Sequence, residues 1–316
     1  MVSWLISLPG ATSPVDWQWD ASPDAASAHL REPTVESLRP TVLSEAFAGE
    51  DTMGKTTITT RVGTWDEALV REAAEENRYG LAKKYPRETL ILDVGAHIGG
   101  FAIAASERGA RVWCFEPDPE NFRLLMENTA AYRRRGQIRA EWKAVWRSDR
   151  RCVSLPFNSL RRLEGEWGIQ TGAGTCCIET QGPGMVKVPA IPLDRVLREA
   201  GSVELLKLDC EFAEYPILLT SRYLRRVRSV VAEFHEVSGP LVPEARVGSI
   251  DVFCGEHLAG ALLHAGFEVT FNRTSACHGY LYAARSPGQA RGKPAGGSAD
   301  RAGRSVRPSE TSRPSH

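Results

Sequence analysis

The sequence has no excess of charge of either sign. Its 316 residues include 39 lysines and arginines against 39 aspartates and glutamates. A balanced charge argues against a nucleic-acid duplex or an anionic membrane as the principal partner, because both attract a strongly basic surface. We therefore expect no nucleic-acid and no membrane partner. A small or neutral substrate fits this composition better, and nothing in it indicates an oligomeric state.

Long apolar runs and cysteine frameworks are also missing. The apolar stretch in MVSWLISLPG at the start is too short to span a bilayer, and no basic segment precedes it as in a secretory signal. Seven cysteines make an odd number without a CxxC pair, which is typical of reduced thiols. These absences predict a cytoplasmic protein.

Sustained apolar patterns are absent from both ends of the chain. Residues 1–50 mix Pro, Ser, Ala and acidic residues without a period, and we expect a loosely ordered leader there. Residues 286–316 contain almost no apolar residue, which predicts a disordered tail. The folded domain is then expected over residues 51–285, and the Gly-rich stretch 152–192 is expected to be an insertion beside its sheet.

What the middle of the chain does contain is an alternation of strand and helix patterns. A β-branched run at 56–62 precedes a helical spacing at 64–77. Four apolar strand-like runs follow, at 89–95, 110–118, 203–209 and 227–236. Apolar runs joined by helices predict a mostly parallel sheet covered on both faces, which is a doubly wound α/β fold. Two runs near the end, 266–271 and 279–285, predict a closing antiparallel hairpin.

The first of these apolar strands runs into a glycine-containing loop, ILDVGAHIGGF (91–101). Ligands of open α/β sheets bind at the carboxyl ends of the strands. Gly95 and Gly99 would let the backbone turn tightly against such a ligand, and Asp93 places a carboxylate at the strand end. His97 either contacts the ligand or lies exposed. The spacing is not the dinucleotide pattern GxGxxG.

An acidic residue ends the next strand, in CFEPD. Glu116 lies at the separation from the glycine loop where a carboxylate accepts hydrogen bonds from both hydroxyls of a ribose. This combination favours an adenosyl ligand with free ribose hydroxyls, although Asp93 and Glu116 also fit ordinary polar strand ends. Asp149, in a later loop, is a candidate partner of the adenine amine.

Several blocks in this order resemble the FkbM-type family of methyltransferases. The blocks are ENRYG (76–80), LDVGAHIGGF (92–101), FEPDPENFRLL (115–125), IPLD (191–194), LLKLDCEFAEYPIL (205–218) and AEFHE (232–236). The resemblance covers roughly residues 56–285. It implies a class I methyltransferase fold of Rossmann-like type, S-adenosylmethionine as the methyl donor, and O-methylation of a hydroxyl on a sugar or natural product.

One position departs from the family pattern. The family usually has glycine after the glutamate of the block that here reads LDCEFAE, and this chain has Phe212. A bulky side chain there would reshape the acceptor pocket or mark a member with altered or lost activity. The alternative to an enzyme is therefore a catalytically inactive, methyltransferase-like binding domain.

Methyl transfer needs a positioned acceptor oxygen and help with the loss of its proton. Asp209 and Glu211 end one strand, and Glu233 and His235 end the next, so all four are candidate site residues, with Asp209 also facing the cofactor. His235 is the first candidate for the general base, because histidine titrates near neutral pH. Two alternatives stay open. In the first, His235 and Glu233 form a purely structural hydrogen bond. In the second, Asp209, Glu211 and His235 hold a divalent metal ion.

A competing motif lies earlier in the chain. GEDTMGKT (Gly49–Thr56) matches the phosphate-loop pattern GxxxxGK[ST] and would indicate a nucleotide-binding enzyme. That mechanism needs a buried strand before the loop and a helix after it. The flanking TVLSEAFA and TTITTRV predict neither, so we expect an accidental match.

Overall fold

The computed structural model describes residues 40–43, 57–158, 163–165, 168–170, 185–236, 241–250, 252–275 and 277–286. Most of the predicted leader, the phosphate-loop match Gly49–Thr56 and the predicted tail beyond Ser286 lie outside these residues. The expectations for those segments stay predictions.

A seven-stranded sheet forms the centre of the domain, in the order β13-β14-β12-β11-β3-β4-β5. Its strands are β3 (Leu90–Val94), β4 (Arg111–Phe115), β5 (Ile138–Glu141), β11 (Val203–Leu208), β12 (Val227–His235), β13 (Glu268–Arg273) and β14 (His278–Ala284). The strands from β12 to β5 pair in parallel, while β14 is antiparallel to β12 and to β13. The predicted doubly wound sheet with a C-terminal antiparallel hairpin is confirmed.

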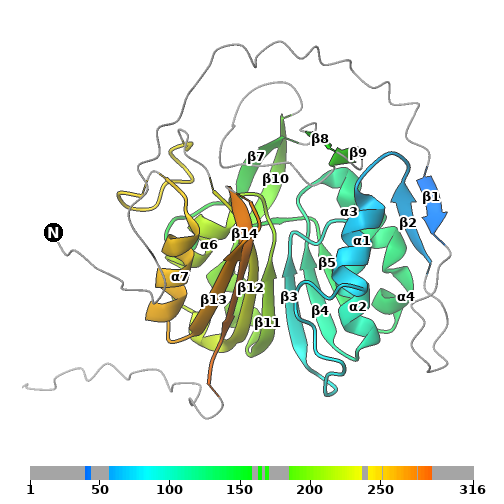
Figure 1. Cartoon of the computed structure of the whole chain (residues 1–316), viewed down its shortest axis with the longest axis horizontal. Helices are drawn as coiled ribbons and strands as arrows, with labels where there is room; N and C mark the ends of the chain where they lie inside the picture. Colours follow the sequence, from blue (N-terminus) through cyan, green and yellow to red (C-terminus); the bar gives the residue numbers. More distant parts are fainter. Residues whose placement is uncertain are drawn as a thin grey trace, which may run out of the picture. The chain divides into compact units, whose positions relative to one another are not determined.

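The chain order reverses between β3 and β11. From β3 the chain moves outward through β4 to β5, and it then returns to the other side of β3 to form β11 and β12 (Figure 1). Connections therefore leave these two strands in opposite directions, which opens a crevice at their carboxyl ends. The predicted site residues of β3, β4, β11 and β12 lie near the carboxyl ends of these strands or directly after them, at this crevice.

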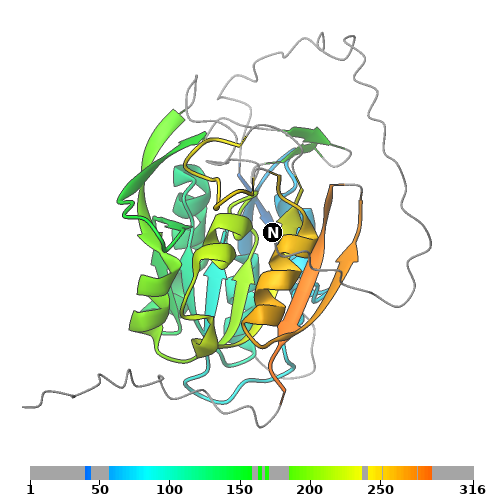
Figure 2. The ribbon, with the colours of Figure 1, turned by 90° about the vertical axis from the view of Figure 1, so that its left-hand side faces the viewer.

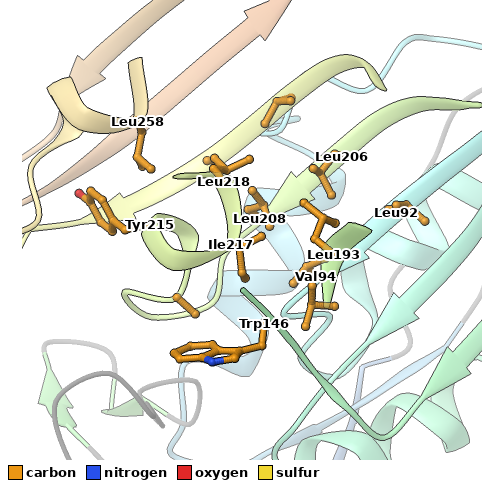
Figure 3. Close-up of a cluster of buried hydrophobic side chains, with 14 of the residues drawn as sticks. Leu92, Val94, Trp146, Leu193, Leu206, Leu208, Tyr215, Ile217, Leu218 and Leu258 are labelled. Atoms are coloured by element: carbon orange, nitrogen blue, oxygen red, sulfur yellow. The ribbon is translucent and has the colours of Figure 1, made fainter. Parts of the chain in front are cut away.

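Helices cover both faces of the sheet (Figures 1 and 2). One face packs against α1 (Asp66–Ala74), α2 (Gly100–Glu107), α3 (Pro119–Asn128) and α4 (Ala130–Arg134). The other face packs against α5 (Leu193–Ala200), α6 (Glu214–Thr220) and α7 (Gly255–His264). Figure 3 shows this second core, where Leu92, Leu206 and Leu208 of the sheet meet Ile217 and Leu218 of α6. Burial on both faces explains why these strands are continuous apolar runs.

A smaller sheet, β6-β10-β7, lies beside the main one, and its strands β7 and β10 belong to the stretch 152–192 expected as an insertion. Its strands are β6 (Ala144–Trp146), β7 (Ser154–Asn158) and β10 (Met185–Pro192), and β8 (Leu163–Gly165) pairs with β9 (Gly168–Gln170) separately. β10 pairs in parallel with β6 and antiparallel with β7. Leu155, Phe157 and Val188 are buried in the core that contains α5 and α6. The small sheet is thus anchored to the domain by apolar packing.

Three local features differ from the sequence expectations. The strand β1 (Pro40–Leu43) falls in the segment expected as a leader and pairs antiparallel with β2 (Ile58–Arg61). The helix expected over 64–77 is shorter, at Asp66–Ala74. The edge strand β5 was not expected, because its sequence IRAE alternates apolar and charged residues instead of forming an apolar run. Among the helices of the described segments, none has the length and apolar character needed to cross a membrane.

Candidate active site

A cavity of about 310 Å³ lies at the reversal point of the sheet, where the carboxyl ends of its central strands meet. Seven of the predicted site residues line it: Gly95, His97, Glu116, Asp209, Glu211, Glu233 and His235. They come from the loops after β3, β4 and β11 and from the last residues of β12. The predicted donor and acceptor ends therefore share one space.

Gly95 lies where the loop after β3 meets the loop after β11. Its φ is +77°, and a Cβ at this position would lie 1.7 Å from the carbonyl oxygen of Asp209. The amides of Gly95 and Ala96 both donate to the carbonyl of Phe115, at 3.0 and 3.1 Å. No residue with a side chain fits here, since both the backbone angle and the space exclude it.

Two other residues predicted at this loop lie behind the cavity and do not line it. Asp93 is fully buried and forms an ion pair with Lys207 Nζ at 3.2 Å. Lys207 also donates to the carbonyl of Gly95 at 2.6 Å, so the pair holds the glycine turn from beneath. Gly99 is the N-cap of α2 with φ +98°, and a Cβ there would meet side chains of Leu125 and Thr129 on α3 and just beyond it. Its role is close packing of helices.

The carboxylate of Glu116 lines the cavity and is held in place by two backbone amides. Its Oε2 accepts from the amide of His97 and its Oε1 from the amide of Asp118, both at 2.8 Å. Asp118 in turn caps α3 by accepting from the amides of Glu120 and Asn121, which fixes the turn. Burial raises the pKa of Glu116 to about 8. Each oxygen keeps a lone pair for one further donor, and this fits two hydroxyls of a ribose.

His97 adopts a left-handed φ of +50° and belongs to a buried polar network. Its Nε2 lies 3.5 Å from Asp66 Oδ1, and Asp66 forms a two-pronged pair with Arg61 at 2.9 and 3.0 Å. Arg61 also donates to Asn121 Oδ1 at 2.7 Å. Burial lowers the pKa of His97 to about 4, so the ring is neutral at pH 7. The network ties the glycine loop to α1 and α3.

Asp149, the candidate partner of the adenine amine, is not among the residues that line this cavity. Its two carboxylate oxygens accept from Arg147 at 2.6 and 2.7 Å. The Arg147 side chain is buried and also donates to the carbonyls of Glu244 and Arg246. The structure thus gives Asp149 a local partner and leaves its predicted contact with a cofactor without support.

His235 lies in a cluster of carboxylates at the other end of the cavity. Its Nε2 is 3.9 Å from oxygens of both Glu211 and Glu233, and its Nδ1 is 3.6 Å from Glu214. Burial alone would lower the pKa of His235, but the carboxylates of Glu211 and Glu214 raise it well above the ordinary value. Burial raises the pKa of Glu211 to about 7.

The loop that carries Glu211 has an unusual backbone. Glu211 and Phe212 are consecutive residues with φ of +50° and +72°. Positive φ costs a bulky residue roughly 1–2 kcal/mol, and glycine adopts it freely. The position at which the family usually has glycine is thus one whose backbone favours glycine. The Phe212 ring does not line the cavity, and its centroid lies 5.5 Å from that of His235.

Two tyrosines and a histidine of the site were not identified from the sequence. The Tyr79 hydroxyl donates to Asp209 Oδ2 at 2.9 Å, and the Tyr280 hydroxyl donates to Glu233 Oε2 at 2.8 Å. His278 Nε2 lies 3.3 Å from Glu233 Oε1. Tyr79 lies in the ENRYG block, which was a usable signal. Tyr280 and His278 reach the site through pairing of β14 with β12, which local sequence does not reveal.

The described residues contain no group of three or more His, Cys, Asp or Glu side chains arranged to hold a metal ion. The hypothesis of a divalent ion on Asp209, Glu211 and His235 therefore gains no support from this geometry.

The family model described as the methyltransferase FkbM domain matches residues 93–268, more than half of the chain. The 31-O-demethyl-FK506 methyltransferase FkbM of Streptomyces tacrolimicus is 29% identical over 175 residues, which cover 48% of this chain and 67% of that protein.

The solved structures that this chain matches include two methyltransferases. The methyltransferase FkbM from Methylobacillus flagellatus is 16% identical with a TM-score of 0.39, and the match covers 65% of this chain and 46% of that one. A SAM-dependent methyltransferase from Agrobacterium tumefaciens is 11% identical with a TM-score of 0.42, covering 84% of this chain and 76% of that one. The assignment rests on the family match, by which the chain belongs to the FkbM family of S-adenosylmethionine-dependent methyltransferases.

Proposed function

We propose that this protein transfers a methyl group from S-adenosylmethionine to a hydroxyl oxygen of a sugar or natural product. The observation that carries the proposal is the single cavity that joins Glu116 to the cluster around His235. When bound, S-adenosylmethionine supplies an electrophilic methyl group on a sulfonium. The donor would lie with its ribose on Glu116 and its reactive end toward the loop after β11.

The chain's own residues would position the acceptor and take its proton. Carboxylates of Glu211 and Glu233 accept hydrogen bonds from acceptor hydroxyls, and His235 between them receives the proton as the oxygen attacks. The raised pKa of His235 makes the neutral ring a strong base, but less of it is present at pH 7. Glu211, with a pKa of about 7, is the second candidate for this role. Both groups belong to one coupled titrating pair.

Two measurements on the full chain test the proposal. Isothermal titration with S-adenosylmethionine measures donor binding, and a methyl-transfer screen against hydroxylated sugars and macrocycles detects turnover. Binding followed by transfer to an oxygen supports the proposal. Binding without transfer to any acceptor would favour the inactive binding domain, for which the left-handed Phe212 is the motivating observation.

The phosphate-loop hypothesis concerns Gly49–Thr56, which lies outside the described residues. It predicts ATP binding that Lys55→Ala abolishes, and a titration with ATP decides it. The cytoplasmic location is part of our proposal and rests on the cysteine usage of the sequence.

A further inference from the structure

Part of the cavity wall comes from outside the segment that the family model matches. The donor-binding features Gly95, His97 and Glu116 lie inside that segment. Six other lining residues lie outside it, before residue 93 or after residue 268: Trp65, Leu69, Glu72, Arg78, His278 and Tyr280. They belong to α1, to the turn that follows it and to β14. Figure 1 shows that these elements are far apart in the sequence.

One face of α1 contributes three of these residues. Trp65, Leu69 and Glu72 are spaced four and three residues apart, so they share a side of the helix, and all three line the cavity. Trp65 adjoins Asp66, which contacts His97 at the donor end. Glu72 is the last of the three along the helix, and it pairs with the next element, the turn at Arg78.

Glu72 and Arg78 form an ion pair in the wall. Arg78 Nη2 lies 3.1 Å from Glu72 Oε1, and the side chains of Arg78 and Glu72 are 31% and 16% exposed. The same nitrogen also donates to Glu76 Oε2 at 3.0 Å. The Arg78 guanidinium stacks over the Tyr280 ring at 5.3 Å, and the Tyr282 hydroxyl donates to the Arg78 carbonyl at 2.9 Å. Tyr280 also donates to Glu233. A continuous set of contacts therefore fixes the pair next to the carboxylate of β12.

The sheet order places this pair on the acceptor side. Tyr280 lies on β14, which is three strands from β3 in the sheet. Neighbouring strands are about 4.8 Å apart, so β14 lies roughly 14 Å from the strand that carries the glycine turn. Arg78 of the pair contacts β14, whereas the proposed ribose site lies after β4, on the opposite side of β3.

The hydrogen-bonding groups of Glu72 and Arg78 favour some methyl acceptors over others. A carboxylate only accepts hydrogen bonds and a guanidinium only donates them, whereas each hydroxyl does both. Two neighbouring hydroxyls on a ring can therefore bond to both members of the pair. An acceptor with a single hydroxyl in apolar surroundings would remove water from Glu72 and Arg78 and replace fewer of the hydrogen bonds that the water made, which is costly.

We infer that Glu72 and Arg78 bind a vicinal diol of the acceptor, so that the substrate is a polyhydroxylated ring such as a sugar and not an apolar macrocycle. The inference rests on the proposed function, because it concerns the acceptor of the same cavity. It assigns substrate selection to α1 and β14, and donor binding to the loops after β3 and β4.

The test measures binding, so that it does not depend on turnover. The full chain is saturated with S-adenosylhomocysteine and titrated with methyl pyranosides that carry a vicinal diol and with their monodeoxy counterparts. We expect the parent to prefer the diol by about tenfold, the scale of one hydrogen bond to a charged group. Glu72→Gln and Arg78→Met should abolish this preference and leave the affinity for S-adenosylhomocysteine within about twofold.

Matched controls come from the same helix. Glu75→Gln and Arg71→Met remove the same groups from exposed positions that do not line the cavity, and they should keep the preference. Melting curves of all four variants check that each is folded. An unchanged preference in the Glu72 and Arg78 variants overturns the inference, as does a parent that binds no pyranoside.

Loss of S-adenosylhomocysteine affinity in the Glu72 and Arg78 variants also overturns it, because the pair would then hold the donor's amino-acid group. Methyl transfer to the same pyranosides is measured separately. A diol preference without any transfer would refute the proposed function and leave the binding role of the pair intact.

Discussion

The two ends of the cavity are built by different means. At the donor end, backbone groups do the positioning: the Gly95 amide donates to Phe115, and the carboxylate of Glu116 accepts from two amides at 2.8 Å. At the acceptor end, side chains face one another. His235 lies 3.6–3.9 Å from three carboxylates. One of these, Glu211, is on a loop with two consecutive residues of positive φ.

This difference matches two roles: donor binding, which is shared by the family, and acceptor binding, which can vary. Backbone hydrogen bonds fix a site whatever the neighbouring side chains are, which suits a donor common to a whole family. Side-chain contacts change with single substitutions, and part of the acceptor wall lies outside the family match. We therefore expect substitutions at the donor end to affect folding and donor binding, and substitutions at the acceptor end to affect turnover and pH dependence.

The largest effect is expected at the glycine turn. Gly95→Ala places a Cβ 1.7 Å from the Asp209 carbonyl oxygen, at a φ of +77°. We expect it to lower the free energy of unfolding by more than about 4 kcal/mol, which only severe steric conflicts do. Gly136→Ala is the matched control, since its φ is +72° and nothing lies within 4 Å. It should cost only about 1 kcal/mol. Urea unfolding measures both, and equal costs would show that the loops do not meet as described.

The second effect concerns proton transfer at the acceptor end. His235→Ala should lower kcat by about 100-fold or more, while donor affinity stays nearly unchanged, because a general base acts in the transition state. The parent's rate should rise with pH through a pKa well above 6.5, as the neutral base forms. That limb should vanish in the variant.

The pH profile also distinguishes His235 from Glu211. If Glu211 is the base, a limb remains in His235→Ala. Its pKa should lie above about 7, because the variant has lost the cation that lowers the pKa of Glu211. A variant with the parent's kcat and profile would leave His235 only a structural role.

The third effect is on donor affinity. Glu116→Gln should weaken binding of S-adenosylhomocysteine by about 2 kcal/mol, or roughly 30-fold, the scale of a hydrogen bond to a charged group. The exposed Glu127→Gln is the control. Because the pKa of Glu116 is raised to about 8, the carboxylate is mostly protonated at lower pH. Parent affinity should therefore increase up to about tenfold per pH unit towards pH 8, and the variant should not follow. Titration calorimetry between pH 6 and 9 would refute this if both curves were parallel.

The donor end was largely predictable from the sequence, because its determinants are close in the chain. Gly95 and Glu116 follow apolar strands that the pattern identifies, and strand ends in a parallel sheet meet at one edge. The predictions for Asp93 and Gly99 located the right loop but not its orientation. Whether a side chain points into the cavity or into the core depends on packing with Lys207 and Leu125, which are distant in sequence.

The acceptor end was predictable only in part. The predicted residues His235, Glu211 and Glu233 lie near strand ends, but the pKa values of His235 and Glu211 depend on mutual contacts that spacing does not encode. The nominal value near 6.5 for a histidine is displaced by three carboxylates that the fold brings together. Tyr280 enters through strand pairing across 47 residues from Glu233. Sequence patterns report local periodicity, and these contacts are not local.

The smallest expected effect concerns Phe212, in the loop that follows β11. At ordinary helical positions, glycine is less stable than alanine by roughly 0.5–1 kcal/mol. At Phe212 the order should reverse, because its φ of +72° strains alanine and not glycine. We expect Phe212→Gly to be more stable than Phe212→Ala by about 1 kcal/mol, although both lose the ring that packs against the core.

Phe122, a partly buried residue inside α3, supplies the control, and there the alanine variant should be the more stable. Urea unfolding of the four variants measures the difference in stability between the glycine and the alanine variant at each position. Both variants at a position lack the ring, so the loss of the ring cancels in that difference. The same order at both positions would contradict a left-handed Phe212. A reversed order would show that the backbone at Phe212 is strained by a side chain. The pH profile of the Phe212→Gly variant then tests what that ring does: if it helps to bury His235, its removal should raise the kinetic pKa, because burial is the contribution that lowers it.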